Sequence, residues 1–228
     1  MVKINRVDSE RTERAIEVLM REKAKNGDYN QPEVNIALKE VFHGKCYICE
    51  NKAVTSYQIE HLIPHKDNVD LKFDWKNLFW ACAHCNNTKG NKFTPILNCN
   101  EVEVEKKIAF RKVGYFGTDE KYCFSIVDDD TEEVRNTIDL LNAVYYGNTA
   151  QKELEAINIR RTLRKDISKF KEHIREYCEE PEGEEKEDLK SWVERELKEN
   201  SSFTAFKRWI IWDNAEKFPE FVEFLDSL

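Results

Sequence analysis

Two Cys-x-x-Cys pairs are the feature that most limits how this chain can fold. The pairs are Cys46-Tyr-Ile-Cys49 and Cys82-Ala-His-Cys85, and 32 residues lie between them. Two residues between the cysteines of a pair let both thiolates reach one ion, and zinc takes four such ligands in a tetrahedron. The spacing therefore predicts a structural zinc site that closes this segment into a small unit. The alternative is four buried thiols without a metal, and His84 is expected at the surface rather than as a ligand.

The segment between the two pairs carries polar residues in an unusual order. Gln58-Ile-Glu-His-Leu-Ile-Pro-His65 is followed by Trp75-Lys-Asn-Leu78, and the second pair runs on into Cys85-Asn-Asn-Thr-Lys-Gly90. A strand over residues 57–61, a second short strand over 78–80 and a helix from about residue 86 account for the pattern. The order predicts a small ββα finger that the zinc site holds closed.

This order resembles the zinc-containing HNH endonuclease family, whose pattern is acid-His, then Pro, then Asn-Leu, then Cys-x-x-Cys-Asn-x-x-Lys-Gly. The resemblance covers residues 45–92 and fixes several uncommon residues in order. It implies a ββα-metal finger in an enzyme that hydrolyses phosphodiester bonds, in double-stranded DNA above all. Such hydrolysis needs a base for water, a metal ion at the phosphate and stabilisation of the leaving oxygen.

The resemblance implies roles for four residues of the finger. His61 is expected to be the general base, because imidazole can take a proton from water near neutral pH. Glu60 and Asn86 are expected to bind the catalytic ion, and an oxygen-rich set of ligands suits Mg²⁺ or Mn²⁺. Asn77 is expected to pin the loop that aims His61. The family usually has Asp where this chain has Glu60, which is one methylene longer. The alternatives are a surface salt bridge for Glu60 and a helix N-cap for Asn86.

Three further residues are candidates for contact with the substrate phosphate. Lys89 lies near the start of the predicted helix and could hold a phosphate together with the helix N-terminus, and Lys92 could do the same from the next turn. His65 could bind the ion or a phosphate, and it is otherwise a loop residue.

Outside the finger, apolar residues recur mostly at helical spacing, so the fold class is expected to be α+β and mostly α-helical. Strand-like alternation is limited to residues 110–127, where Tyr115 is one of the alternating aromatics and a hairpin is expected at 117–119. Helices are predicted over residues 9–25, 32–42, 131–142, 151–177, 189–197 and 203–228. The predicted organisation is N-terminal helices (1–44), the HNH finger with its four-cysteine zinc site (45–95), an α-rich middle region (96–178), an acidic linker (179–190) and C-terminal helices (191–228).

The net charge of −8 argues against a nucleic-acid partner, but the charge is unevenly distributed. Residues 41–92 hold seven lysines and five acids, whereas residues 179–188 hold seven acids and one lysine. Much of the acidity is thus far from the finger along the chain. Bare electrostatics still predict weak DNA binding, so a basic partner could supply the missing affinity.

The seven cysteines are an odd number, which speaks against a disulfide framework. The three outside the pairs, Cys99, Cys123 and Cys178, are expected to be ordinary buried thiols. The sequence has no run of about 18 apolar residues, so no membrane span is expected. Its first residues lack the apolar core of a signal peptide. The expected location is therefore the cytoplasm.

A looser resemblance extends beyond the finger. Thr137-Ile-Asp-Leu-Leu-Asn142 and Ile159-Arg-Arg161 resemble the region after the finger in the HNH subunit of Septu-type antiphage systems (PtuB-like), which some retrons also encode. This implies the nuclease effector of a bacterial defence complex with an ATPase partner (PtuA-like). The chain has no Gly-x-x-x-x-Gly-Lys-Ser/Thr loop, so the partner would bind the nucleotide. The alternatives are a stand-alone restriction or homing nuclease, and a zinc-stabilised binding or scaffold subunit with a vestigial site.

The C-terminal residues 203–224 are rich in aromatic side chains. We interpret this run as a segment that docks on the chain's own core. The alternative is a helix that inserts into a groove of a partner.

Overall fold

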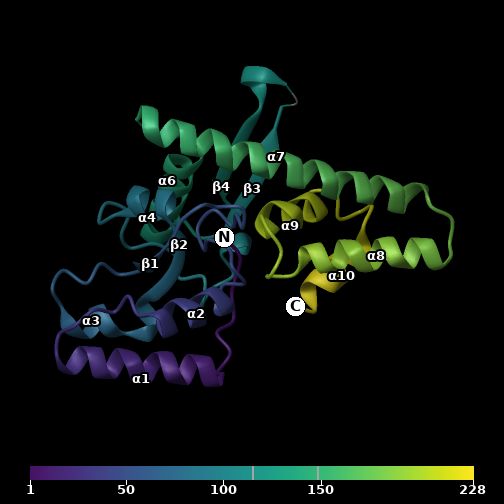
Figure 1. Ribbon diagram of the computed structural model, residues 1–228. Helices are drawn as coiled ribbons and strands as arrows, with labels where there is room; N and C mark the ends of the chain where they lie inside the picture. Colours follow the sequence, from purple (N-terminus) through teal and green to yellow (C-terminus); the bar gives the residue numbers. More distant parts are fainter. Residues whose placement is uncertain (115, 148) are drawn as a thin grey trace.

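The N-terminal helices lie where the sequence predicts them. The computed structural model describes residues 1–114, 116–147 and 149–228, and it begins with α1 (Glu10–Ala24) and α2 (Pro32–Val41). Ser9 caps α1 by accepting a hydrogen bond from the backbone N–H of Thr12, which satisfies a donor that the first turn leaves free. Pro32 opens α2, where a missing N–H costs nothing. The two helices pack against each other as a hairpin (Figure 1).

The predicted ββα finger is present. Strands β1 (Tyr57–His61) and β2 (Leu78–Cys82) are antiparallel, with Tyr57 opposite Cys82 and His61 opposite Leu78. Helix α4 (Ala83–Lys89) follows β2 directly and packs against both strands. It begins earlier than predicted because the thiol of Cys82 accepts a hydrogen bond from the backbone N–H of Cys85 and caps the helix.

The connection between the two strands contains two short helices that the sequence patterns do not predict. They are α3 (Val69–Phe73) and the 3-10 helix η1 (Trp75–Asn77). Asn68 and Asp74 start them, because each side chain accepts hydrogen bonds from backbone N–H groups of the turn that follows. These two caps fix the backbone around Lys72 and Asn77, which both contact the site described below.

The middle region combines a hairpin with two long helices. After α5 (Val104–Lys107), strands β3 (Ile108–Val113) and β4 (Lys121–Ile126) form the predicted antiparallel pair, with the 3-10 helix η2 (Gly117–Asp119) in its turn. Tyr115 lies outside the described residues. Helices α6 (Glu132–Tyr146) and α7 (Ala150–Glu179) follow and are longer than predicted. Figure 1 shows α7 running across the molecule, from the side of the finger to the C-terminal helices.

The C-terminal region corrects one predicted boundary. Helices α8 (Glu184–Leu197), α9 (Thr204–Trp212) and α10 (Pro219–Asp226) fill it, so the predicted linker over residues 179–190 shrinks to the short turn between α7 and α8. The acids that suggested a linker lie in the first turn of α8, where negative charge stabilises a helix. Val193 and Leu197 provide the buried face of that helix.

Two groups of buried side chains hold the fold together. The larger joins the N-terminal hairpin, the finger, the β3–β4 hairpin, α6 and α9, and the smaller joins α7, α8 and α10. Phe206 of α9 lies in the larger group, edge-on to Phe110 and Phe124. Phe218 and Phe221 lie in the smaller group. The aromatic C-terminal run therefore packs on the chain's own core.

The cysteines outside the pairs differ in burial. Cys99 is buried as expected, whereas Cys123 and Cys178 are exposed, so the expectation of three buried thiols is wrong for two of them. Cys123 lies on the outer face of β4, whose alternate residues Tyr122 and Phe124 point inward. Among the described helices, none is long and apolar enough to cross a membrane.

Candidate active site and zinc centre

The four paired cysteines converge on one point. Their sulfur atoms all lie within 4.8 Å of one another, and all four side chains are buried. A tetrahedral zinc ion with Zn–S bonds of about 2.3 Å places its sulfurs about 3.8 Å apart, and the Sγ atoms of Cys49 and Cys82 are 4.0 Å apart. The donor set therefore fits zinc. Within the described residues, no other group of three or more His, Cys, Asp or Glu side chains is arranged to hold an ion.

His61 ends β1 and has a defined tautomer. Its Nε2 lies 3.1 Å from the backbone oxygen of Lys72. A carbonyl oxygen can only accept, so Nε2 carries the hydrogen and Nδ1 keeps its lone pair. In the described part of the chain, nothing donates a hydrogen bond to Nδ1. The side chain is 9% exposed. This geometry leaves one nitrogen able to take a proton from water, as a general base must.

Asn77 fixes the loop that carries this carbonyl. Its Nδ2 donates to the backbone oxygens of Ile63 and Leu71, at 2.9 and 3.0 Å, and its Oδ1 accepts from the N–H of Ile63 at 2.8 Å. The Asn77 side chain thus ties both ends of the loop together next to Lys72.

Glu60 is buried and both its oxygens are engaged. Its Oε1 accepts from the ammonium of Lys89 at 2.6 Å, and its Oε2 accepts from the hydroxyl of Tyr47 at 2.6 Å. Burial raises the pKa of Glu60 to about 7, although Lys89 and Tyr47 oppose the rise. Glu60 is therefore not part of a surface salt bridge. As placed, neither oxygen is open to a catalytic ion.

Lys89 requires a correction. The expectation put its ammonium on a substrate phosphate, but its side chain is fully buried and donates to Glu60 and to the backbone oxygen of His61, at 2.9 Å. The helix start is displaced as well, since Lys89 ends α4 rather than beginning it. Lys92 is exposed, with its ammonium over the ring of its neighbour Phe93.

Replacing Lys89 by Met is expected to destabilise the fold by about 3–5 kcal/mol, because it leaves the Glu60 carboxylate buried without its counter-charge. Lys92→Met is the matched control and should change stability by less than about 0.5 kcal/mol, since that side chain is exposed. Urea unfolding of both variants measures the difference. If Lys89→Met keeps wild-type stability, Lys89 is not the buried partner of Glu60.

Asn86 lies on α4 beside β1. Its Nδ2 donates to Oε1 of Gln58 at 2.8 Å, which leaves the carbonyl-type Oδ1 as a donor for a hard cation. The alternative of a helix N-cap is wrong, because α4 begins at Ala83 with Cys82 as its cap.

His65 lies beside His61. The two ring centroids are 4.8 Å apart, and Nδ1 of His65 lies 3.3 Å from the backbone N–H of Asp67. Nδ1 therefore accepts, and in the neutral ring Nε2 carries the hydrogen and can donate. Lys66 and Asp67 adopt left-handed φ angles of 43° and 66°. Residues other than glycine rarely adopt this backbone conformation, and it often occurs in loops that form a functional site.

Three residues at the site have no signal in the sequence. Tyr29, in the turn between α1 and α2, places its ring 4.6 Å from that of His61, with the planes at 84°. Lys72 supplies the carbonyl for His61, and Tyr47 supplies the hydroxyl for Glu60. Tyr29 lies far from His61 in the chain, and any residue type can supply a backbone carbonyl. Only the packing reveals these contacts.

His61 is expected to stay neutral well below its ordinary pKa. Burial lowers the pKa of His61 to about 4, although its hydrogen bond to Lys72 opposes the shift. The unfolded chain therefore binds this proton more readily, and the contribution of His61 to stability is lost as the pH falls from about 6.5 towards 4. The cleavage rate should accordingly not fall as the pH is lowered through about 6.5. A single-turnover pH–rate profile tests this, and a fall at that pH would contradict it.

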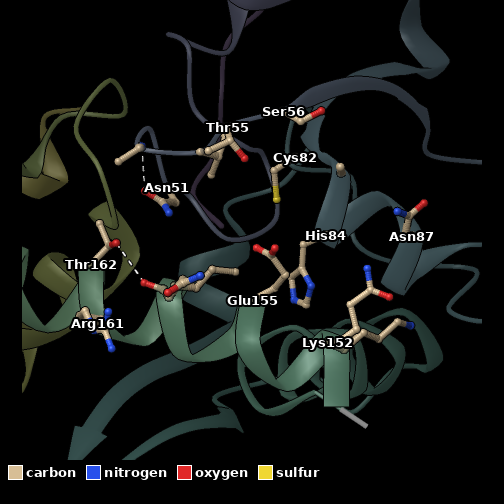
Figure 2. A pocket seen from close by; sticks show the side chains of 16 residues that line it. Asn51, Thr55, Ser56, Cys82, His84, Asn87, Lys152, Glu155, Arg161 and Thr162 are labelled. Atoms are coloured by element: carbon tan, nitrogen blue, oxygen red, sulfur yellow. Dashed lines mark hydrogen bonds between the residues drawn. The ribbon is translucent and has the colours of Figure 1, made fainter. Parts of the chain in front are cut away.

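A separate cavity of about 530 Å³ lies between residues 51–56, the start of α4 and α7. Figure 2 shows Cys82, His84 and Glu155 at this space. Ser56 lines it and precedes β1, whereas His61 ends β1, so a rise of about 3.3 Å per strand residue puts roughly 16 Å between Ser56 and His61. His84 is half-buried and bonded to the backbone oxygen of Val144 at 2.9 Å, outside the cysteine cluster.

The geometry has the parts of an HNH nuclease finger, namely two strands, a helix, a buried histidine with a free nitrogen and a neighbouring asparagine. Residues 46–92 match the family model described as HNH endonuclease. This segment is therefore an HNH endonuclease domain.

Two curated relatives match part of the chain. The Septu protein PtuB of Bacillus thuringiensis is 32% identical over 79 residues, which cover 32% of this chain and 31% of the relative. The Septu protein PtuB of Bacillus mycoides (strain KBAB4) is 35% identical over 85 residues, which cover 31% of this chain and 29% of the relative. The match thus spans less than a third of the length of either relative.

Proposed function

We propose that this chain is a metal-dependent endonuclease that hydrolyses phosphodiester bonds in DNA. The observation that carries the proposal is the state of His61. Its Nε2 donates a hydrogen bond to the backbone oxygen of Lys72, and among the described residues nothing donates to its Nδ1 at the end of β1. In the proposed reaction, Nδ1 takes a proton from the attacking water while a new P–O bond forms and the bond to the leaving oxygen of the nucleotide breaks.

The residues around His61 divide the remaining tasks. Asn77 holds the loop in register, and His65 can donate from Nε2 to a phosphate oxygen. Lys92 is exposed and can contact the substrate backbone further out. A divalent ion, Mg²⁺ or Mn²⁺, would supply charge stabilisation at the phosphate when bound. Asn86 offers an oxygen for it, but Glu60 does so only if its bonds to Lys89 and Tyr47 open. We therefore assign no step to Glu60.

The zinc site belongs to the structure of the finger rather than to the reaction. Zinc with four thiolate ligands has no open position for water or substrate. Cys46, Cys49, Cys82 and Cys85 hold the first knuckle against the end of β2, where the N–H of Tyr47 also donates to the oxygen of Trp80 at 3.0 Å. We propose that zinc fixes the strands on which His61 lies.

The biological setting is proposed from the relatives. Both are described as Septu proteins, and the residues after the finger resemble the same group. We infer that the chain is the nuclease effector of a cytoplasmic antiphage complex, with an ATPase as partner. The partner would supply nucleotide binding, and a basic surface on it would offset the acidity of this chain.

One observation favours a second candidate, a scaffold subunit with a vestigial site. The Lys89 ammonium donates a hydrogen bond to the carboxylate of Glu60, which stands where the family has its metal-binding acid. Plasmid cleavage separates the two functions. Purified protein is incubated with supercoiled DNA and Mg²⁺, Mn²⁺ or EDTA, with and without a candidate ATPase, and with His61→Ala in parallel. Cleavage that needs the ion and His61 supports the nuclease. No cleavage under any condition, or equal cleavage by both proteins, supports the scaffold.

A further inference from the structure

Tyr29, in the turn between α1 and α2, lies against the imidazole of His61. The ring centroids are 4.6 Å apart with the planes at 84°, an edge-to-face contact. Tyr29 is outside residues 46–92, which match the nuclease family model. We propose that Tyr29 is a positioning residue for His61, and that the N-terminal hairpin thereby completes the active site. This inference rests on the proposed nuclease function.

Lys72 ties the same turn to His61 by a second route. Its backbone oxygen accepts from Nε2 of His61, and its ammonium donates to Oδ1 of Asn26 at 3.4 Å and to the oxygen of Gly27 at 3.0 Å. One residue thus bonds both the catalytic ring and the turn that carries Tyr29. The ring of His61 is therefore held by a hydrogen bond on one nitrogen and by an aromatic contact, and both depend on the position of residues 26–29.

Hydrogen bonds within the chain hold the turn itself. The carboxylate of Asp28 accepts from the N–H of Asn30 at 2.9 Å, and the N–H of Gly27 donates to the oxygen of Glu22 at 2.8 Å. A fixed turn presents the Tyr29 ring at one place, which is what orienting a catalytic group requires.

The ring rather than the hydroxyl of Tyr29 makes this contact. In the described part of the chain, the hydroxyl has no hydrogen-bond partner, and the ring packs partly against the core. With 9% of its side chain exposed, His61 depends on such neighbours to select one rotamer. A phenyl ring should therefore serve almost as well as the phenol, whereas a methyl group should leave the imidazole free to turn.

The test compares three variants of the full chain under the conditions in which the wild type cuts DNA. Tyr29→Ala removes the ring, and Tyr29→Phe keeps it. Ile16→Ala trims a partly buried side chain of the same hairpin and serves as the structural control. Tyr29→Ala is expected to lower kcat about 10- to 100-fold, because a small misplacement of a catalytic group is costly, with KM within about threefold of wild type. Tyr29→Phe and Ile16→Ala should cut nearly as the wild type does.

A second measurement does not depend on cleavage. Diethyl pyrocarbonate modifies exposed histidines, and peptide mass spectrometry reports the rate at His61. Tyr29→Ala is expected to speed modification of His61 several-fold, and Ile16→Ala is not.

The proposal is overturned if Tyr29→Ala keeps its kcat, if Tyr29→Phe loses as much as Tyr29→Ala, or if Ile16→Ala loses as much as either. An unchanged modification rate at His61 in Tyr29→Ala also overturns it. If the wild type cuts no DNA with or without a partner, the nuclease function fails, and the modification rates still decide whether Tyr29 covers His61.

Discussion

Replacing His61 by Ala is expected to reduce the rate of DNA cleavage by about 10²- to 10⁴-fold, the usual contribution of a positioned general base. The Nε2 of the imidazole donates to the backbone oxygen of Lys72, and no described residue donates a hydrogen bond to Nδ1. In the described part of the finger, His65 is the other imidazole that lies beside it at the end of β1. Single-turnover cleavage with saturating protein measures the chemical step, and zinc content and unfolding midpoint show that the variant is otherwise intact.

Two other histidine variants test whether the loss of cleavage is specific to His61. His65→Ala removes the neighbouring ring and is expected to cost less than His61→Ala, because it contacts the substrate phosphate in the proposed reaction and takes no proton from water. His173→Ala changes a half-buried histidine that stacks on Trp192 in the distant pairing of α7 and α8, and it should leave cleavage unchanged. If His65→Ala abolishes cleavage while His61→Ala does not, the two imidazoles exchange roles.

The finger is the part of the fold that the sequence predicts best. Residues 57–61 form the predicted strand, and the four cysteines meet as their spacing requires. Both features follow from local constraints, namely the order of residues around His61 and the short reach of two thiolates that share one ion. The helices at Ser9 and Pro32 are predictable for the same reason, since a cap or a proline marks a helix start without help from the rest of the chain.

The buried charges of the site could not be predicted in this way. The sequence places Glu60 and Lys89 in one motif, but whether a carboxylate faces a metal, solvent or an ammonium depends on how α4 packs against β1. Tyr47 completes the Glu60 site from inside the first cysteine pair, where only the cysteines attract notice. The same limit explains the start of α8. A run of acidic residues predicts a solvated linker, and only the structure shows that Val193 and Leu197 are buried and make the segment a packed helix.

The contact of Tyr29 with His61 also could not be predicted from the sequence, because the two residues are far apart in the chain. It exists because α1 packs near α3 and carries the turn over the loop that Asn77 holds. No local pattern around Tyr29 distinguishes it from an ordinary turn aromatic. The candidate site therefore extends beyond its motif, because a residue outside the matched segment lies against His61.

Loss of the zinc site is expected to have the largest effect on stability. The finger has a small core of its own, and structural zinc contributes on the order of 10 kcal/mol to the folding of such units at neutral pH. Cys49→Ser should therefore leave zinc unbound and unfold the finger, with loss of the near-UV circular dichroism to which the stacked pair Tyr57 and Trp80 contributes. A zinc chelator should do the same to the wild type, and metal analysis should find one zinc per wild-type chain.

Cys123→Ser is the matched control, because it changes a cysteine to serine on the exposed face of β4, outside the cluster. It should keep its zinc and change stability by less than about 0.5 kcal/mol. The two variants separate loss of a ligand from loss of a thiol. If Cys49→Ser unfolds at the wild-type temperature, or if the wild type carries no zinc and is insensitive to the chelator, the four thiols are only buried cysteines. The fixed position of His61 must then come from Asn77, Lys72 and the packing of α4 alone.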